Sequence, residues 1–156
     1  MKTSIGLSAE QLKTSTDILS TVLADEVTLY IKTRKFHWNV SGESFMELHK
    51  LFEHQYKEIE EVIDEVAERI GKLGSVTIGT MAQYTKMTRL KESPNDYPER
   101  MKMVEELLKD HESVIKALRD DIDKCDESGD AGTTDFLTGV MQEHETIAWT
   151  LRRYLK

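Results

Sequence analysis

The stretch from Ser44 to Gly74 constrains the fold most, because its pattern predicts one long uninterrupted helix. Its apolar residues recur every three or four positions, the spacing of one helix face: Phe45, Leu48, Phe52, Ile59, Ile63, Val66 and Ile70. Ser44 with Glu47 three residues later predicts a capping box at the start, and Gly71 and Gly74 predict the end. A helix of about thirty residues is a rod of roughly 45 Å, along which the rest of the chain must pack.

Three more segments carry the same helical periodicity. They cover residues 8–37, a stretch from the prolines at 94 and 98 to about residue 127, and residues 133–154. Residues 128–132 predict a turn between the last two helices. The segment 75–96 is long for a bare loop, so we expect a short helix at 80–86, packed down by Met81, Tyr84 and Met87. Without a competing strand pattern, the prediction is an all-α four-helix bundle with a short extra helix in the crossover between its second and third helices.

Composition predicts a single domain over residues 1–156 in a reducing compartment. The one cysteine, Cys125, cannot form an intrachain disulfide, and no apolar run is long enough for a membrane span. The first six residues lack the apolar stretch of a signal peptide, so we expect a cytoplasmic protein with no membrane partner. A net charge of −8 attracts cations and disfavours DNA binding.

The long helix also carries metal-ligand side chains away from its apolar face. His49/Glu53 and Asp64/Glu68 form two i, i+4 pairs, and imidazole with carboxylate suits iron, zinc or manganese. The two pairs lie roughly 22 Å apart along one helix, so a single copy cannot close a site. An antiparallel second copy, related by a two-fold axis near residues 58 and 59, would bring them together in two equivalent sites. His37, at the end of the preceding helix, could supply another nitrogen.

The alternatives are ordinary structural roles or a different metal site. Taken alone, Glu53, Asp64 and Glu68 would be ordinary solvated surface, and His54, His111 and His144 are interpreted as incidental. A site inside one bundle would use Glu-x-x-His pairs. No such pair exists here, because the residues three before the histidines are Arg34, Met46, Leu51, Leu108 and Met141.

Two spaced motifs resemble those of the Dps family, the dodecameric mini-ferritins named as DNA-binding proteins from starved cells. The matching residues are Phe36-His37-Trp38-Asn39-Val40, Leu48-His49, Phe52-Glu53 and Asp64-Glu65-Val66-Ala67-Glu68-Arg69-Ile70. The likeness continues through Asp135-Phe136-Leu137, His144-Glu145, Trp149 and Arg152-Tyr154-Leu155, and so covers nearly the whole chain. The position of Glu53 is often Asp in that family, so the carboxylate here reaches one methylene further.

The resemblance implies a ferritin-like fold, a homododecamer built from two-fold dimers, and ferroxidase sites shared between subunits. The implied iron ligands are His37, His49 and Glu53 of one subunit with Asp64 and Glu68 of its mate. Trp38 would lie beside the iron and intercept stray oxidising equivalents. Asp126, Asp130 and Asp135 would surround a three-fold pore that admits iron.

The leading hypothesis is therefore an iron-detoxifying and iron-storing ferroxidase that oxidises Fe(II), with hydrogen peroxide as the oxidant that the resemblance implies. Zinc or manganese could compete for the site, and the residues alone leave peroxide and oxygen both open. One alternative is a DNA-compacting protein with secondary ferroxidase activity. Only Lys2 and Lys13 are basic in the first thirty residues, which disfavours it. Another alternative is a scaffold with an inactive site.

Overall fold

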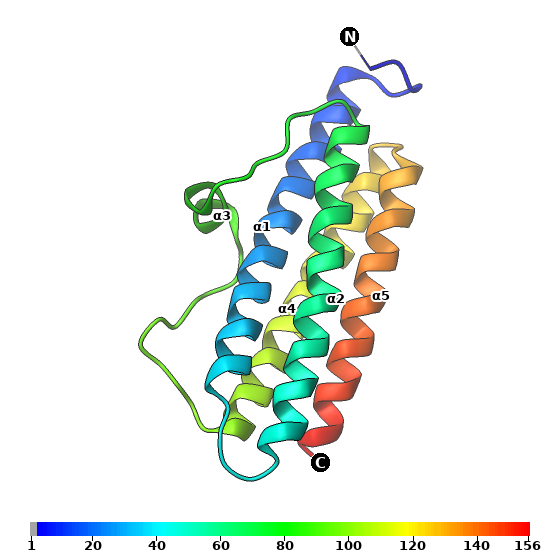
Figure 1. Ribbon diagram of the computed structural model, residues 1–156. Coiled ribbons are helices and arrows are strands. Elements are labelled where there is room, and N and C mark those ends of the chain that lie inside the picture. Colours follow the sequence, from blue (N-terminus) through cyan, green and yellow to red (C-terminus); the bar gives the residue numbers. More distant parts are fainter. Residues whose placement is uncertain (1–2) are drawn as a thin grey trace.

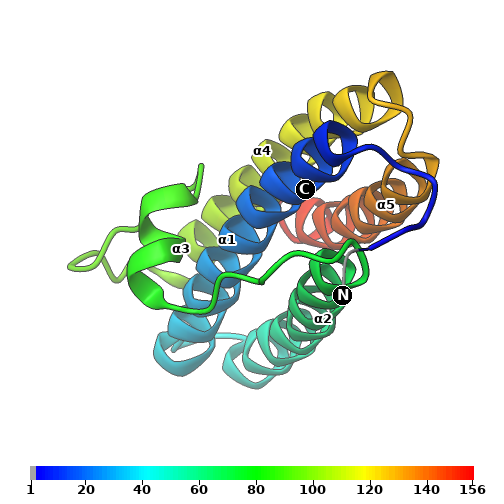
Figure 2. The same cartoon turned by 90° about the horizontal axis from the view of Figure 1, so that it is seen from above.

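The computed structural model describes residues 3–156, and these residues form a helical bundle (Figures 1 and 2). The helices are α1 (Ala9–Asn39), α2 (Phe45–Lys72), α3 (Met81–Met87), α4 (Arg100–Glu127) and α5 (Ala131–Tyr154). No strand occurs among residues 3–156. None of the helices there is long and apolar enough to cross a membrane. Lys2, one of the two basic residues noted near the start of the chain, lies outside the described residues. The predicted all-α bundle with a short extra helix in the crossover is confirmed.

The four long helices run antiparallel within the pairs α1/α2 and α4/α5, and a long crossover joins the two pairs (Figure 1). Because α2 ends at the opposite end of the bundle from the start of α4, the crossover must travel its whole length. A continuous apolar core fills the centre, with Leu19, Phe36, Phe52 and Leu107 among its fully buried members. Burial of this seam is the main source of the stability of the bundle.

The predicted capping box at the start of α2 is wrong. Ser44 has a φ of 60° and makes no side-chain hydrogen bond to the helix, whereas a capping serine needs an extended backbone. The tight loop from α1 to α2 uses positive φ angles at Gly42 and Ser44, which turns the hydroxyl of Ser44 away from the free amides. The other end agrees with prediction: Gly74 is left-handed, and the amide of Ser75 donates to the carbonyl of Ile70.

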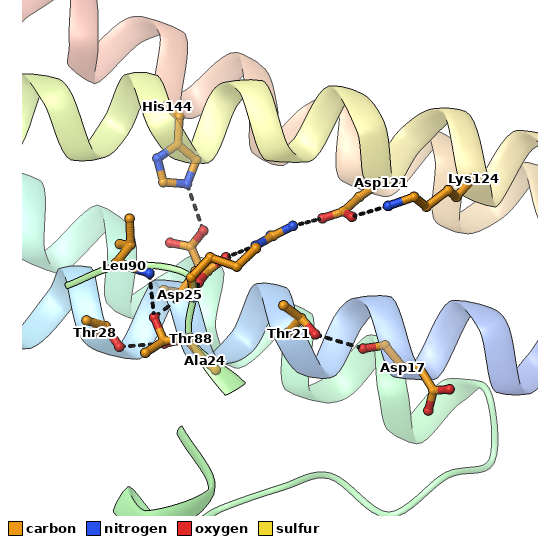
Figure 3. Close-up of polar contacts among 12 residues, drawn as sticks. Asp17, Thr21, Ala24, Asp25, Thr28, Thr88, Leu90, Asp121, Lys124 and His144 are labelled. Atoms are coloured by element: carbon orange, nitrogen blue, oxygen red, sulfur yellow. Dashed lines mark hydrogen bonds and ion pairs between the residues drawn. The ribbon is translucent and has the colours of Figure 1, made fainter. Parts of the chain in front are cut away.

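The crossover is held down by α3 and by polar contacts. Tyr84 of α3 packs against the core as expected, whereas Met81 is 60% exposed, so the expected packing of Met81 is wrong. Arg89, after α3, donates from Nε to Asp25 at 2.7 Å and from Nη1 to Asp121 at 2.8 Å. Both carboxylates are buried, and Figure 3 shows Asp25 and Asp121 on different long helices. Arg89 therefore joins the crossover to α1 and α4.

The core also contains a polar network that the sequence interpretation missed. His144 of α5 is bonded through Nε2 to Glu26 of α1 at 2.8 Å and through Nδ1 to Nδ1 of His111 of α4 at 2.8 Å. All three side chains are almost completely buried, so the reading of His111 and His144 as incidental is wrong. Figure 3 shows His144 pointing across the bundle toward α1.

The two buried histidines have pKa values shifted in opposite directions. Burial, with the neighbouring charge on His144, holds the pKa of His111 well below its ordinary value of 6.5. Burial also opposes protonation of His144, but the facing carboxylate of Glu26 outweighs it and raises the pKa of His144. The pair therefore takes up a first proton, on His144, more readily than a second.

We expect His111→Gln to reduce the loss of stability in acid. Below pH 6.5 the unfolded state protonates His111 while the folded state does not, so folding stability falls as the pH drops through this range. Each unit of depressed pKa corresponds to about 1.4 kcal/mol at most. The raised pKa of His144 makes folding stability fall as the pH rises above 6.5. Both proteins contain His144. Thermal unfolding at pH 7.5 and pH 5.0 should show a smaller drop in Tm for His111→Gln than for the natural protein. An equal drop in both would contradict this account.

Candidate metal centre

Two histidines from consecutive helices form a closely packed pair beside the α1–α2 loop. The rings of His37, near the end of α1, and His49, in the second turn of α2, stack with centroids 3.8 Å apart and planes inclined by 18°. Nδ1 of His37 lies 2.7 Å from the carbonyl oxygen of His49, and Nδ1 of His49 lies 2.9 Å from the carbonyl oxygen of His37. Each ring is thus tied to the backbone of the other helix.

These reciprocal contacts determine the tautomer of both rings. A carbonyl oxygen can only accept a hydrogen bond, so each Nδ1 must carry the proton and donate it. In the neutral imidazole the lone pair is then on Nε2, which is the atom left free to bind a metal ion. A ligating histidine ordinarily has its other ring nitrogen held by an oxygen acceptor in this way. His37 and His49 are therefore preorganised as a pair of nitrogen ligands.

Glu53 follows His49 by one turn of α2 and is the third predicted ligand on this side. Lys57 lowers the pKa of Glu53 through a hydrogen bond of 2.6 Å and its charge, and the two imidazoles lower it further. The carboxylate is thus ionised and lies within the electrostatic reach of both rings. The structure therefore pairs His37 with His49 and leaves Glu53 near them, bonded to Lys57.

The other two sequence-predicted ligands lie elsewhere on the same helix. Asp64 and Glu68 are exposed on α2, and Glu68 is paired with Lys72 at 3.1 Å. Along a straight helix the centre of this pair lies roughly 22 Å from that of His49 and Glu53. Within residues 3–156 no three histidine, cysteine, aspartate or glutamate side chains are grouped closely enough to hold a metal ion. Within one protomer the five predicted ligands therefore stay in two separate groups.

An aromatic cluster adjoins the histidine pair. Trp38 is 62% exposed, and the guanidinium of Arg34 lies 5.2 Å from its ring centroid. Arg34 also faces the rings of Tyr56, at 4.6 Å, and Tyr30, at 5.4 Å. Trp38 was predicted near the site from the sequence, whereas Tyr30, Arg34 and Tyr56 were not. The spacing of Tyr30, Arg34 and Trp38 at i, i+4 and i+8 was the available signal, because it places them on one face of α1.

The three aspartates predicted at a pore differ in their surroundings. Asp126 and Asp135 are exposed near the α4–α5 turn. Asp130 is only 3% exposed and accepts hydrogen bonds from Ser15 at 2.7 Å and from the Thr133 hydroxyl at 2.6 Å. It caps α5, which starts two residues earlier than predicted. Asp130 thus has a structural role and does not face solvent. A position lining a pore therefore remains a prediction for Asp126 and Asp135 alone of the three.

We expect His49→Ala to weaken metal binding to the assembled protein by at least about tenfold, because it removes a preorganised ligand whose supporting contacts alone are worth that much. Titration calorimetry with Zn²⁺ would measure the change. His54→Ala is the matched control, since His54 is exposed on the same helix, where it pairs with Glu58. Equal affinities for the two variants would exclude His49 as a ligand.

Comparison with known proteins places this geometry in a family. The ferritin-like domain family matches residues 16–156. A low temperature-induced protein of Nostoc is 45% identical over 153 residues, covering 97% of this chain and 86% of that protein. DNA protection during starvation protein 2 of Bacillus anthracis is 36% identical over 140 residues, covering 89% of this chain and 94% of that protein.

A solved structure agrees over the full length. The Dps protein of Vibrio cholerae O1, described as a member of a broad superfamily of ferritin-like diiron-carboxylate proteins, superposes with a TM-score of 0.92 at 31% identity. The match covers 100% of this chain and 98% of that one. The family match, these relatives and the shared helical bundle show that the chain belongs to the ferritin-like family and, within it, to the Dps proteins.

Proposed function

We propose that this protein is an iron-storing mini-ferritin that oxidises Fe(II) at sites shared between two copies of the chain. His37, His49 and Glu53 of one copy would bind the metal together with Asp64 and Glu68 of a second copy. The observation that carries the proposal is the division of the ligands into two partial sites on one rigid helix, neither of which can hold a metal ion alone.

Symmetry supports this pairing. The positions of His49 and Glu68, and those of Glu53 and Asp64, are both centred between residues 58 and 59 on α2. A two-fold axis at that point would therefore place both carboxylates of one copy opposite the histidine and carboxylate of the other. An isologous interface repeats each contact, so the dimer would hold two equivalent sites. The exposed apolar side chains beside the histidine pair, Trp38, Phe45 and Met46, would be covered by such a contact.

The ligand chemistry fits the oxidation of iron. The free Nε2 atoms bind Fe(II), and the carboxylates favour Fe(III), which makes the loss of an electron easier. Lys57 and Lys72 pair with Glu53 and Glu68, and the entering cations would displace them. Hydrogen peroxide is the proposed oxidant: its O–O bond breaks as it takes one electron from each of two Fe(II) ions, and two hydroxide ions form.

Storage would follow in the hollow of a larger homo-oligomer, proposed to be a dodecamer built from these two-fold dimers. A groove between α2 and α5 is lined by Glu58, Glu61 and Glu143. Burial and the neighbouring carboxylates raise the pKa of Glu143, which reflects the crowding of negative charge there. If this face lines the hollow, it would bind Fe(III) and start a mineral. Iron would enter past Asp126 and Asp135, whose charge attracts cations.

We expect the double variant His37→Gly, His49→Gly to abolish rapid oxidation of Fe(II) by hydrogen peroxide without changing the native mass. The glycines remove both nitrogen ligands, whereas the bundle core does not depend on their rings. Stopped-flow absorbance of ferric iron, with His54→Gly as the control, measures the effect. Unchanged kinetics in the double variant would remove the proposed mechanism.

Binding to DNA is the second candidate, since several relatives are named for DNA protection. The net charge of −8 opposes it, because binding requires several cations on one face. Consumption of iron and peroxide would protect DNA without contact. A gel-shift assay should therefore show no complex at physiological salt, and a stable complex there would favour the second candidate.

A further inference from the structure

A chain of aromatic rings leads away from the histidine pair along α1 and α2. The ring of Tyr56 meets His37 edge-on at a centroid distance of 5.3 Å. Tyr30 then meets Tyr56 at 6.0 Å with the planes at 88°. Tyr56 is only 8% exposed, whereas Tyr30 is half-buried and reaches the surface of the protomer. The three rings therefore connect the metal ligands to a phenol near solvent.

The hydroxyl of Tyr30 is placed between a cation and a carboxylate. Nη1 of Arg34 donates to Oη of Tyr30 at 2.5 Å, and Oη donates in turn to Oε1 of Glu60 at 3.2 Å. A phenol loses its proton when it is oxidised, so an accepting carboxylate at this position makes the oxidation easier. None of these contacts is needed to build the bundle core, because Tyr30, Arg34 and Glu60 all lie at its margin.

We propose that Tyr30 is an electron donor to the iron site, reached through the ring of Tyr56, and that Glu60 takes its proton. This inference rests on the proposed function. It concerns the turnover in which peroxide meets a site holding only one Fe(II). One electron from that iron would otherwise split peroxide into a hydroxide ion and a hydroxyl radical. A second electron from the protein completes the reduction.

The step is balanced in electrons and protons. The O–O bond of hydrogen peroxide breaks and accepts two electrons, one from Fe(II), which becomes Fe(III), and one from Tyr30. Two hydroxide ions form from the peroxide. Tyr30 transfers its phenolic proton to Glu60 and remains as a neutral radical. Later reduction by a further Fe(II) restores the phenol, with the proton returned from Glu60.

The charges around Arg34 favour Tyr30 over Trp38 as the final electron donor. The guanidinium lies over both rings, so a positive charge formed on either ring is repelled. Tyr30 avoids this cost because its proton leaves for Glu60, and the radical is then uncharged. Trp38 has no carboxylate partner among the hydrogen bonds of the described residues. Oxidation of Trp38 therefore places a cation beside a cation.

The test is electron paramagnetic resonance on the assembled protein, freeze-quenched after addition of hydrogen peroxide at about one Fe(II) per shared site. The natural protein should give a tyrosyl signal, identified by its change when the tyrosines are deuterated. Tyr30→Phe should reduce the amplitude of this signal at least tenfold. It should also release more hydroxyl radical, measured as the adduct of a spin trap. Tyr84→Phe, on α3, is the matched control and should match the natural protein.

Each outcome separates this inference from the proposed function. Iron oxidation with only a tryptophan signal, or a tyrosyl signal that survives Tyr30→Phe, would overturn the role of Tyr30 and leave the shared iron site intact. Glu60→Gln should slow formation of the radical while the rate with two Fe(II) per site stays unchanged. An equal rate of radical formation in Glu60→Gln would overturn the proton transfer. Absence of iron oxidation in the natural protein would instead refute the proposed function itself.

Discussion

The length of α2 is the constraint on which the rest of this molecule depends. A helix of 28 residues is stiff. Each of its two groups of predicted ligands spans neighbouring turns, but the groups are too far apart along the helix to meet within one chain. At one end, the reciprocal hydrogen bonds between His37 and His49 fix both rings and join α2 to α1. At the other, Asp64 and Glu68 stay exposed. The helix is thus a core element and, in the proposed function, one half of a shared site.

Helix periodicity predicted the bundle well because burial of apolar stripes dominates its energetics. The four long segments and the short crossover helix were all found from their spacing and turn residues. Ser44 was misinterpreted because the capping motif describes a residue pair and says nothing of the backbone angle. That angle is set by the tight loop through Gly42. The packing of Met81 was mispredicted for a similar reason, since spacing alone cannot show which residues of a short helix face the bundle.

Polar residues were predicted less well than apolar ones. His111 and His144 come from different helices and meet only in the folded core, so no local pattern announces their contact with each other or with Glu26. Asp130 was interpreted as one of several surface aspartates. In the structure it is buried and accepts a hydrogen bond from Ser15, which lies more than a hundred positions earlier in the chain. The proximity of His37 and His49 was predicted because their positions on two consecutive helices joined by a short loop carry the geometry directly.

The most direct test of the shared site is complementation between two inactive variants. One carries His37→Gly and His49→Gly, and the other carries Asp64→Asn and Glu68→Gln. Each alone should fail to oxidise Fe(II) with peroxide. Co-assembled in equal amounts from unfolded chains, they should recover about a quarter of the sites, because half of the dimers are mixed and each mixed dimer has one intact site. Recovery near that level is the predicted result, and no recovery in verified mixed oligomers would contradict a site built from two chains.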